Sequence, residues 1–62
     1  MVNEFKEELN AIHVALEEIT VDMPKLEKGV SKAARRVRKN LQVIAKAAKT
    51  GRGIALDISK AN

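Results

Sequence analysis

The chain has 62 residues, of which 45% are hydrophobic, and 12 Lys and Arg against 8 Asp and Glu give a formal net charge of +4. A single chain of this length forms at most one domain and buries a core only marginally. There is no cysteine and only one histidine, His13, so we expect no disulfide and no metal site. The chain also lacks a candidate nucleophile and the length to form a pocket, so we expect no cofactor, no small-molecule substrate and no enzyme activity. No apolar run approaches a membrane span and no signal peptide is visible, which indicates a cytoplasmic protein without a membrane partner.

The charge is divided unevenly along the chain. Residues 1–24 carry six acids and one base, a net charge of −5, whereas residues 25–62 carry eleven bases and two acids, a net charge of +9. Such an asymmetry between halves predicts a polyanion as the partner of the basic half.

The first half has the periodicity of an amphipathic helix over about residues 3–20. Its apolar residues step alternately by four and three positions, as in a heptad seam: Phe5, Leu9, Ile12, Leu16, Ile19 and Met23. Asn3 is a plausible N-cap. The helix is predicted to end at Thr20–Pro24, because Thr20 and Val21 are β-branched and Pro24 disfavours helical geometry in the residue before it.

A second helix is predicted over about residues 24–50. Pro24 suits a first turn, and Gly51 in the segment "TGRG" suits the left-handed position after a helix end. Residues 1–50 would then form one helical domain and residues 51–62 a short C-terminal tail. Gly29 has two interpretations, a tolerated glycine inside the helix or the real turn with Ser31 as the cap.

The fold class predicted from these patterns is all-α, a helical hairpin of two amphipathic helices. A single long helix kinked at Pro24 would show the same periodicity, because the seam continues in phase past the proline. Each helix of a hairpin leaves half of its seam exposed, so we expect a homodimer that forms a four-helix bundle or coiled coil.

The bases of the second helix gather on the side opposite its apolar residues. A charge run is ordinarily a solvated face, but such faces alternate in sign, and no acid occurs between Lys28 and Lys49. The candidate nucleic-acid-binding residues are the Lys and Arg of this segment and of the glycine-flanked site after it: Lys28, Lys32, Arg35, Arg36, Arg38, Lys39, Lys46, Lys49 and Arg52.

The segment from Leu26 to Lys46, LEKGVSKAARRVRKNLQVIAK, resembles the bacterial linker-histone-like family. The resemblance is carried by EKG at 27–29, KAA at 32–34 and RVRK at 36–39, followed by a Leu/Ile/Ala helix. Members include the chlamydial histone-like nucleoprotein and short homologues in Bacteroidetes. The resemblance implies a protein that binds and compacts DNA with little sequence preference. The long Lys/Ala-rich tail of the chlamydial members has no counterpart here, so the expectation is binding rather than strong compaction.

The function predicted is that of a small histone-like protein that binds double-stranded DNA through phosphate contacts. Single strands are usually bound by stacking on aromatics, and the one aromatic residue, Phe5, belongs to the seam. Arg52, flanked by glycines, either enters a minor groove or merely follows a helix stop. DNA versus RNA stays open. The expected location is the bacterial nucleoid or a phage- or virus-infected cell. The alternative function is that of a self-assembling helical module that binds an acidic protein partner. A phage could also encode such a module.

Overall fold

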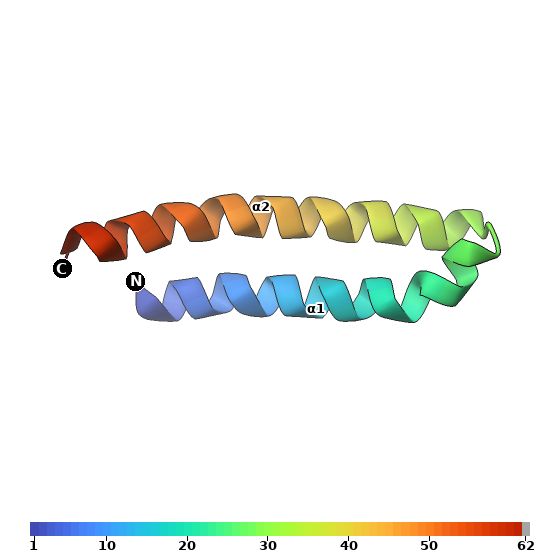
Figure 1. Ribbon diagram of the computed structural model, residues 1–62, viewed down its shortest axis with the longest axis horizontal. Coiled ribbons are helices and arrows are strands. Elements are labelled where there is room, and N and C mark those ends of the chain that lie inside the picture. The colour runs from blue at the N-terminus through green and yellow to red at the C-terminus, as the bar shows by residue number, and fades with distance from the viewer. Residues whose placement is uncertain (62) are drawn as a thin grey trace.

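The computed structural model describes residues 1–61. It contains two helices, α1 (Val2–Glu27) and α2 (Ser31–Ala61), which lie antiparallel and side by side with both termini at the same end (Figure 1). The hairpin is a rod with principal dimensions of 49 × 14 × 12 Å. The predicted all-α hairpin is confirmed, and the single kinked helix is excluded.

The turn of the hairpin lies at residues 28–30, not at Thr20–Pro24 as predicted. Gly29 has φ 77°, and its amide donates to the carbonyl of Leu26 at 2.9 Å, while the Val30 amide donates to that of Lys25 at 3.0 Å. These two bonds form a Schellman motif, which requires a left-handed residue after the helix, and glycine adopts that conformation without strain. Of the two interpretations of Gly29, the turn is therefore correct, although Ser31 is the first residue of α2 rather than its cap.

Pro24 lies inside α1 and does not end it. A proline removes one amide donor from the ladder and its ring crowds the preceding turn, which bends a helix without necessarily terminating it. In Figure 1 the end of α1 nearest the turn, the part of the helix that contains Pro24, bends toward α2. The bend carries the chain toward α2 just before the turn.

Both outer helix ends also differ from the predicted ones. α1 begins at Val2 with Met1 as its N-cap, so Asn3 lies within the helix. α2 does not stop at "TGRG" but continues through residues 51–61. Gly51 is buried, and a Cβ built on it would lie 3.9 Å from the Phe5 ring. A Cβ there would make an ordinary van der Waals contact, so the packing does not require a glycine, and α2 continues through Gly51 despite its low helix propensity.

The buried apolar residues of the seam between the helices are mostly small. The buried apolar residues are Ala15 on α1 and Ala33, Val37 and Ala47 on α2. In α1 the residues facing α2 are those at positions 5, 8, 12, 15, 19, 22 and 26, all buried or half-buried. Their spacing alternates between three and four residues, as expected of a heptad seam, and the small side chains let the two helices approach closely.

Half of the seam predicted for the first helix lies outside the interface. Leu9, Leu16 and Met23 are 44%, 49% and 42% exposed, so half of the predicted seam stays exposed in the hairpin, as expected of two amphipathic helices. They flank the seam on one side, where α2 contributes exposed residues at the same heptad spacing. We call this surface the apolar face and define it by six exposed residues: Leu9, Leu16 and Met23 on α1, with Leu41, Ala48 and Ala55 on α2.

Alanine replacements at two glycines should have opposite effects on stability. Gly53 is helical and nothing lies within 4 Å of a Cβ built on it, so Gly53→Ala should raise the free energy of unfolding by about 0.5–1 kcal/mol. Gly29 has φ 77°, so Gly29→Ala should lower it by about 1–2 kcal/mol. Urea unfolding at fixed protein concentration measures both. Stabilisation by Gly29→Ala would contradict the assigned turn.

Candidate nucleic-acid interface

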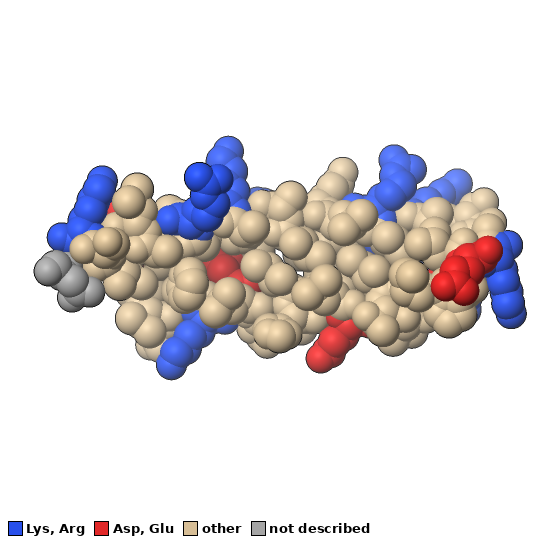
Figure 2. Space-filling view, viewed as in Figure 1, with Lys and Arg blue, Asp and Glu red and all other residues tan. Residues whose placement is uncertain are grey.

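Most predicted binding residues share the outer face of α2. On a helical wheel they lie on the side away from α1, and the space-filling view shows Lys and Arg side chains projecting along the outer edge of α2 (Figure 2). We call this surface the basic stripe and define it by six exposed residues: Lys32, Arg35, Arg38, Lys39, Lys46 and Lys49. It extends over about 25 Å of helix axis, at 1.5 Å per residue. A regular helix holds these charges in one row.

The remaining predicted residues occupy different environments. Lys28 is exposed in the turn, at the far end of the rod from both termini. Arg52 is exposed at the border between the basic stripe and the apolar face, and α2 holds it within continuous helix. The predicted helix stop before Arg52 is therefore wrong, and entry of Arg52 into a minor groove stays a prediction.

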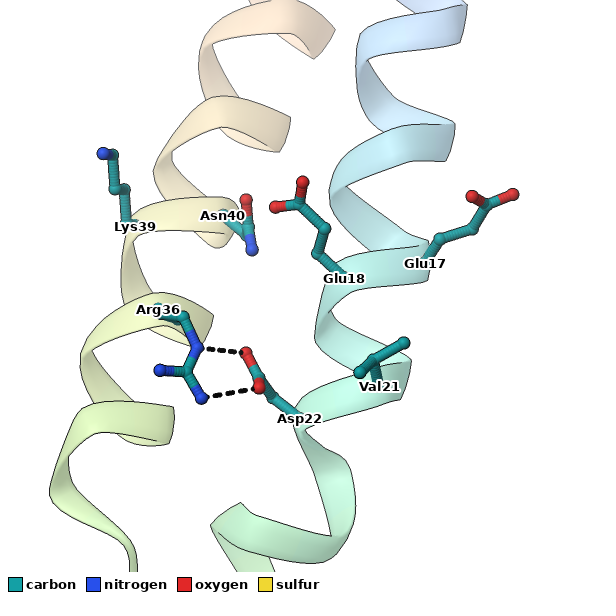
Figure 3. A pocket seen from close by; sticks show the side chains of 7 residues that line it. All are labelled: Glu17, Glu18, Val21, Asp22, Arg36, Lys39 and Asn40. Atoms are coloured by element: carbon teal, nitrogen blue, oxygen red, sulfur yellow. Dashed lines mark hydrogen bonds and ion pairs between the residues drawn. The ribbon is translucent and has the colours of Figure 1, made fainter.

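Arg36 is joined to α1 by an ion pair. Its Nε donates to Oδ2 of Asp22 at 3.0 Å and its Nη2 donates to Oδ1 at 2.8 Å, as Figure 3 shows. The Asp22 side chain is only 9% exposed, whereas that of Arg36 is 47% exposed. A bidentate Arg–carboxylate pair is directional as well as strong. Arg36 therefore connects the two helices, and the Nε hydrogen and the Nη2 hydrogen that hold Asp22 are not available to a phosphate.

The pair changes the titration of both partners. The hydrogen bonds from Arg36 lower the pKa of Asp22 below its ordinary value of 3.8, against desolvation, which raises it, and with smaller help from the positive charges of Arg36 and Lys25. The same hydrogen bonds raise the pKa of Arg36. Asp22 is thus held ionised between the helices.

Asp22, the partner of Arg36, is the residue that sequence reasoning missed. It lies in the segment Thr20–Pro24, where the first helix was predicted to end, but it occupies a seam position, three residues after Ile19 and four before Leu26. A lone acid in heptad register with apolar neighbours was the available signal, because such a residue needs a partner on the facing helix. The partner could not be identified without the register of the two helices.

The ion pair lies in a surface hollow of about 530 Å³ on the side of the hairpin opposite the apolar face. Acids of α1 and bases of α2 both line it: Glu17, Glu18, Val21, Asp22, Arg36, Lys39 and Asn40. In Figure 3, Glu18 extends toward Asn40 of α2, whereas Glu17 points away from it. The mixture of signs makes the hollow a poor site for a phosphate, in contrast to the basic stripe.

The two helices carry opposite net charges. α1 contains seven acids and two bases, for a net charge of −5, and α2 contains nine bases and one acid, for a net charge of +8. The acidic helix therefore lies along the basic one over the length of the hairpin. Within residues 1–61 no three potential metal ligands come together, and neither helix has a stretch apolar enough to cross a bilayer.

The Asp22–Arg36 pair should make stability depend on pH below neutrality. Because the pKa of Asp22 is lowered in the folded chain, its contribution is fully present above the unfolded pKa, near 3.8, and is lost as the pH falls through the lower folded value. Asp22→Asn should destabilise the chain at pH 6, and its deficit relative to wild type should narrow at pH 3. Asp57→Asn, at an exposed position, is the control. Urea unfolding at both pH values measures this, and a deficit independent of pH would contradict it.

The chain matches a known protein family. The chain matches the family described as "Histone H1-like protein Hc1" over residues 6–61, which include nearly all of both helices and the whole basic stripe. No curated protein and no solved structure matches the chain significantly.

Proposed function

The chain belongs to the histone H1-like Hc1 family, and on that premise we propose that it binds duplex DNA through the basic stripe of α2. Membership of this family supports a DNA-binding role of a structural kind rather than an enzymatic one. The observation that carries the proposal is a row of six exposed Lys and Arg, about 25 Å long, on a rigid helix face without an acid between Lys32 and Lys49.

The stripe would bind by contacting successive phosphates. Each Lys or Arg that neutralises a phosphate releases condensed counterions, which supplies affinity independent of base sequence. Arg35 and Arg38 can make bidentate phosphate contacts, while the lysines act as point charges. Phosphate contacts carry no base information, so unrelated duplexes should be bound about equally. The corresponding location is the nucleoid.

Arg36 has a different role in this proposal. Its guanidinium is already held by the Asp22 carboxylate, so its contribution is to connect α1 and α2 and to fix their register. The six stripe residues provide the first contacts with DNA, and Lys28 and Arg52 extend the positive surface at the turn and toward the termini.

A homodimer is part of the proposal. The hairpin alone has no large side chain that is fully buried among residues 1–61, and the apolar face is uncovered. A second copy would supply the missing core as a four-helix bundle. The same exposed face favours the second candidate function, a helical assembly module whose basic stripe binds an acidic protein.

A mobility-shift titration with duplex DNA, single-stranded DNA and RNA of equal length tests the proposal. We expect duplex DNA to be shifted at low salt, with similar affinity for unrelated sequences, and heparin to release it. If no duplex is shifted at low salt, the DNA-binding proposal fails, and the basic stripe would then bind a protein partner instead. Binding of an acidic protein without binding of duplex DNA would support the second candidate; persistence of the homodimer in heparin is expected of both.

A further inference from the structure

The isolated hairpin exposes more surface than a compact chain of its mass. Its accessible surface is 5056 Å² for 6.8 kDa. A compact monomer of this size exposes about 4,000 Å². The excess, about 1,000 Å², is close to the ~800 Å² that each partner buries in a standard protein interface. The excess surface is therefore enough for an interface with one partner along one broad side of the rod.

The apolar face is the side that such a partner would cover. Leu16 and Leu41 are 49% and 52% exposed, and the other four residues of the apolar face are exposed as well. The broad side seen in Figure 2 carries few Lys, Arg, Asp or Glu side chains between the two helices. Its outline is about 700 Å² for a rod of 49 × 14 Å, again near the ~800 Å² per partner of a standard interface. A nearly uncharged face of this size is complementary to itself, which points to a second copy.

Two symmetric arrangements can bring two apolar faces together. With the turns at opposite ends, α1 lies on α1 and α2 on α2. With the turns at the same end, α1 of each copy lies on α2 of the other. In both arrangements the basic stripe, on the outer side of α2, stays exposed.

The charges of the helices decide between the two arrangements. Neighbouring helices in a bundle lie 8–10 Å apart, a distance over which charges interact at physiological salt. Turns at opposite ends would place two helices of net charge +8 beside each other. Turns at the same end place each of them between two helices of net charge −5. Arg38 and Arg52, which border the apolar face, then lie beside an acidic helix instead of a basic one.

We propose that two copies pack through their apolar faces with both turns at the same end, so that acidic and basic helices alternate around the bundle. This rests on the homodimer of the proposed function and specifies its partner surface. The Asp22–Arg36 pair shows which residues of α1 and α2 lie at the same height along the rod. Leu16 lies six residues before Asp22, and Leu41 and Gln42 lie five and six residues after Arg36, so Leu16 is at the height of Leu41 and Gln42. In the proposed arrangement the two-fold axis runs along the rod, so Leu16 of one copy lies at the same height as Leu41 of the other.

Cross-linking of single-cysteine variants tests the arrangement, since the chain has no cysteine of its own. Leu16→Cys and Leu41→Cys chains, one of them carrying a tag that changes its mass, are refolded together and oxidised in glutathione buffer. We expect the mixed disulfide to form at least tenfold faster than a disulfide between two Leu16→Cys chains. Self-linking of Leu16→Cys as fast as the mixed product would overturn the arrangement, because it requires α1 against α1.

Two further measurements keep the outcomes distinct. Sedimentation showing that the wild type is monomeric at micromolar concentration would overturn the second copy as the occupant. Leu9→Cys with Ala48→Cys, one heptad nearer the termini, repeats the test if circular dichroism shows that a variant of the first pair is unfolded. DNA binding is measured separately by mobility shift with the wild type, so failure of this arrangement and failure of the proposed function are told apart.

Discussion

The affinity for duplex DNA is expected to fall with salt with a slope of log K against log salt of about −4. The six stripe residues spread around the outer side of α2, and a straight helix cannot bring all of them to one DNA backbone. About four contacts, each contributing ~0.9, give this slope. The stripes of the proposed dimer face in opposite directions, so one duplex meets one stripe at a time. A slope near zero would mean that the stripe does not bind DNA.

Removing three charges from the centre of the stripe should change this slope strongly. Arg35, Lys39 and Lys46 lie within a narrow arc of the wheel, so their joint replacement by Gln should flatten the slope by about 2–3. All three side chains are exposed, so the fold should be kept. Salt titrations by mobility shift or fluorescence anisotropy measure the slope.

Two matched comparisons show where the contacts are made. Lys6→Gln on α1 removes the same charge as Lys46→Gln but lies outside the stripe, so only the second should flatten the slope, by about 0.9. Arg35→Gln should likewise flatten it. Arg36→Gln should instead lower the free energy of unfolding and leave the slope nearly unchanged, because Arg36 is held by Asp22. Equal slope changes for Arg35→Gln and Arg36→Gln would show that Arg36 also contacts DNA.

Replacing Leu16 with Asp is expected to weaken the dimer at least a hundredfold. Leu16 is 49% exposed on the apolar face, and its replacement would bury one unpaired carboxylate from each copy. At about 1.4 kcal/mol or more for each, the two together account for a factor of 100 or more in the dissociation constant. Sedimentation equilibrium or concentration-dependent unfolding measures the effect.

Val14→Asp is the matched control for Leu16→Asp. Val14 is 46% exposed and lies two residues away, but on the side of α1 turned from the apolar face. Both variants place an Asp at a similarly exposed position inside the same helix, so their direct cost to the hairpin should be similar. We expect Val14→Asp to remain dimeric. Equal weakening by both would mean that the dimer does not form through the apolar face.

The sequence by itself determined the helical class, the division of charge and the basic stripe. These features follow from local periodicity: a helix places residues three and four apart on one side whatever it packs against. The resemblance of Leu26–Lys46 to linker-histone-like proteins was also readable from the residues, and the family match over residues 6–61 confirms it.

Local sequence signals did not determine where the helices end. Pro24, Gly51 and Gly29 each carry a signal for a turn, and local preferences of about 1 kcal/mol do not decide which one is used. In the folded hairpin Gly29 has φ 77° and ends α1, whereas Gly51 is buried against Phe5 within α2. Which of these signals ends a helix therefore depends on the packing of α1 against α2.

The phase of the seam was decided only by the tertiary structure. Phe5, Ile12 and Ile19 belong to two overlapping heptad patterns, one completed by Leu9, Leu16 and Met23, the other by Glu8, Ala15 and Asp22. Hydrophobicity favours the first, yet the hairpin uses the second. Small residues let the helices approach closely, and Asp22 is satisfied because Arg36 faces it from α2. Whether a buried acid has its partner depends on the register between helices, which no single helix contains.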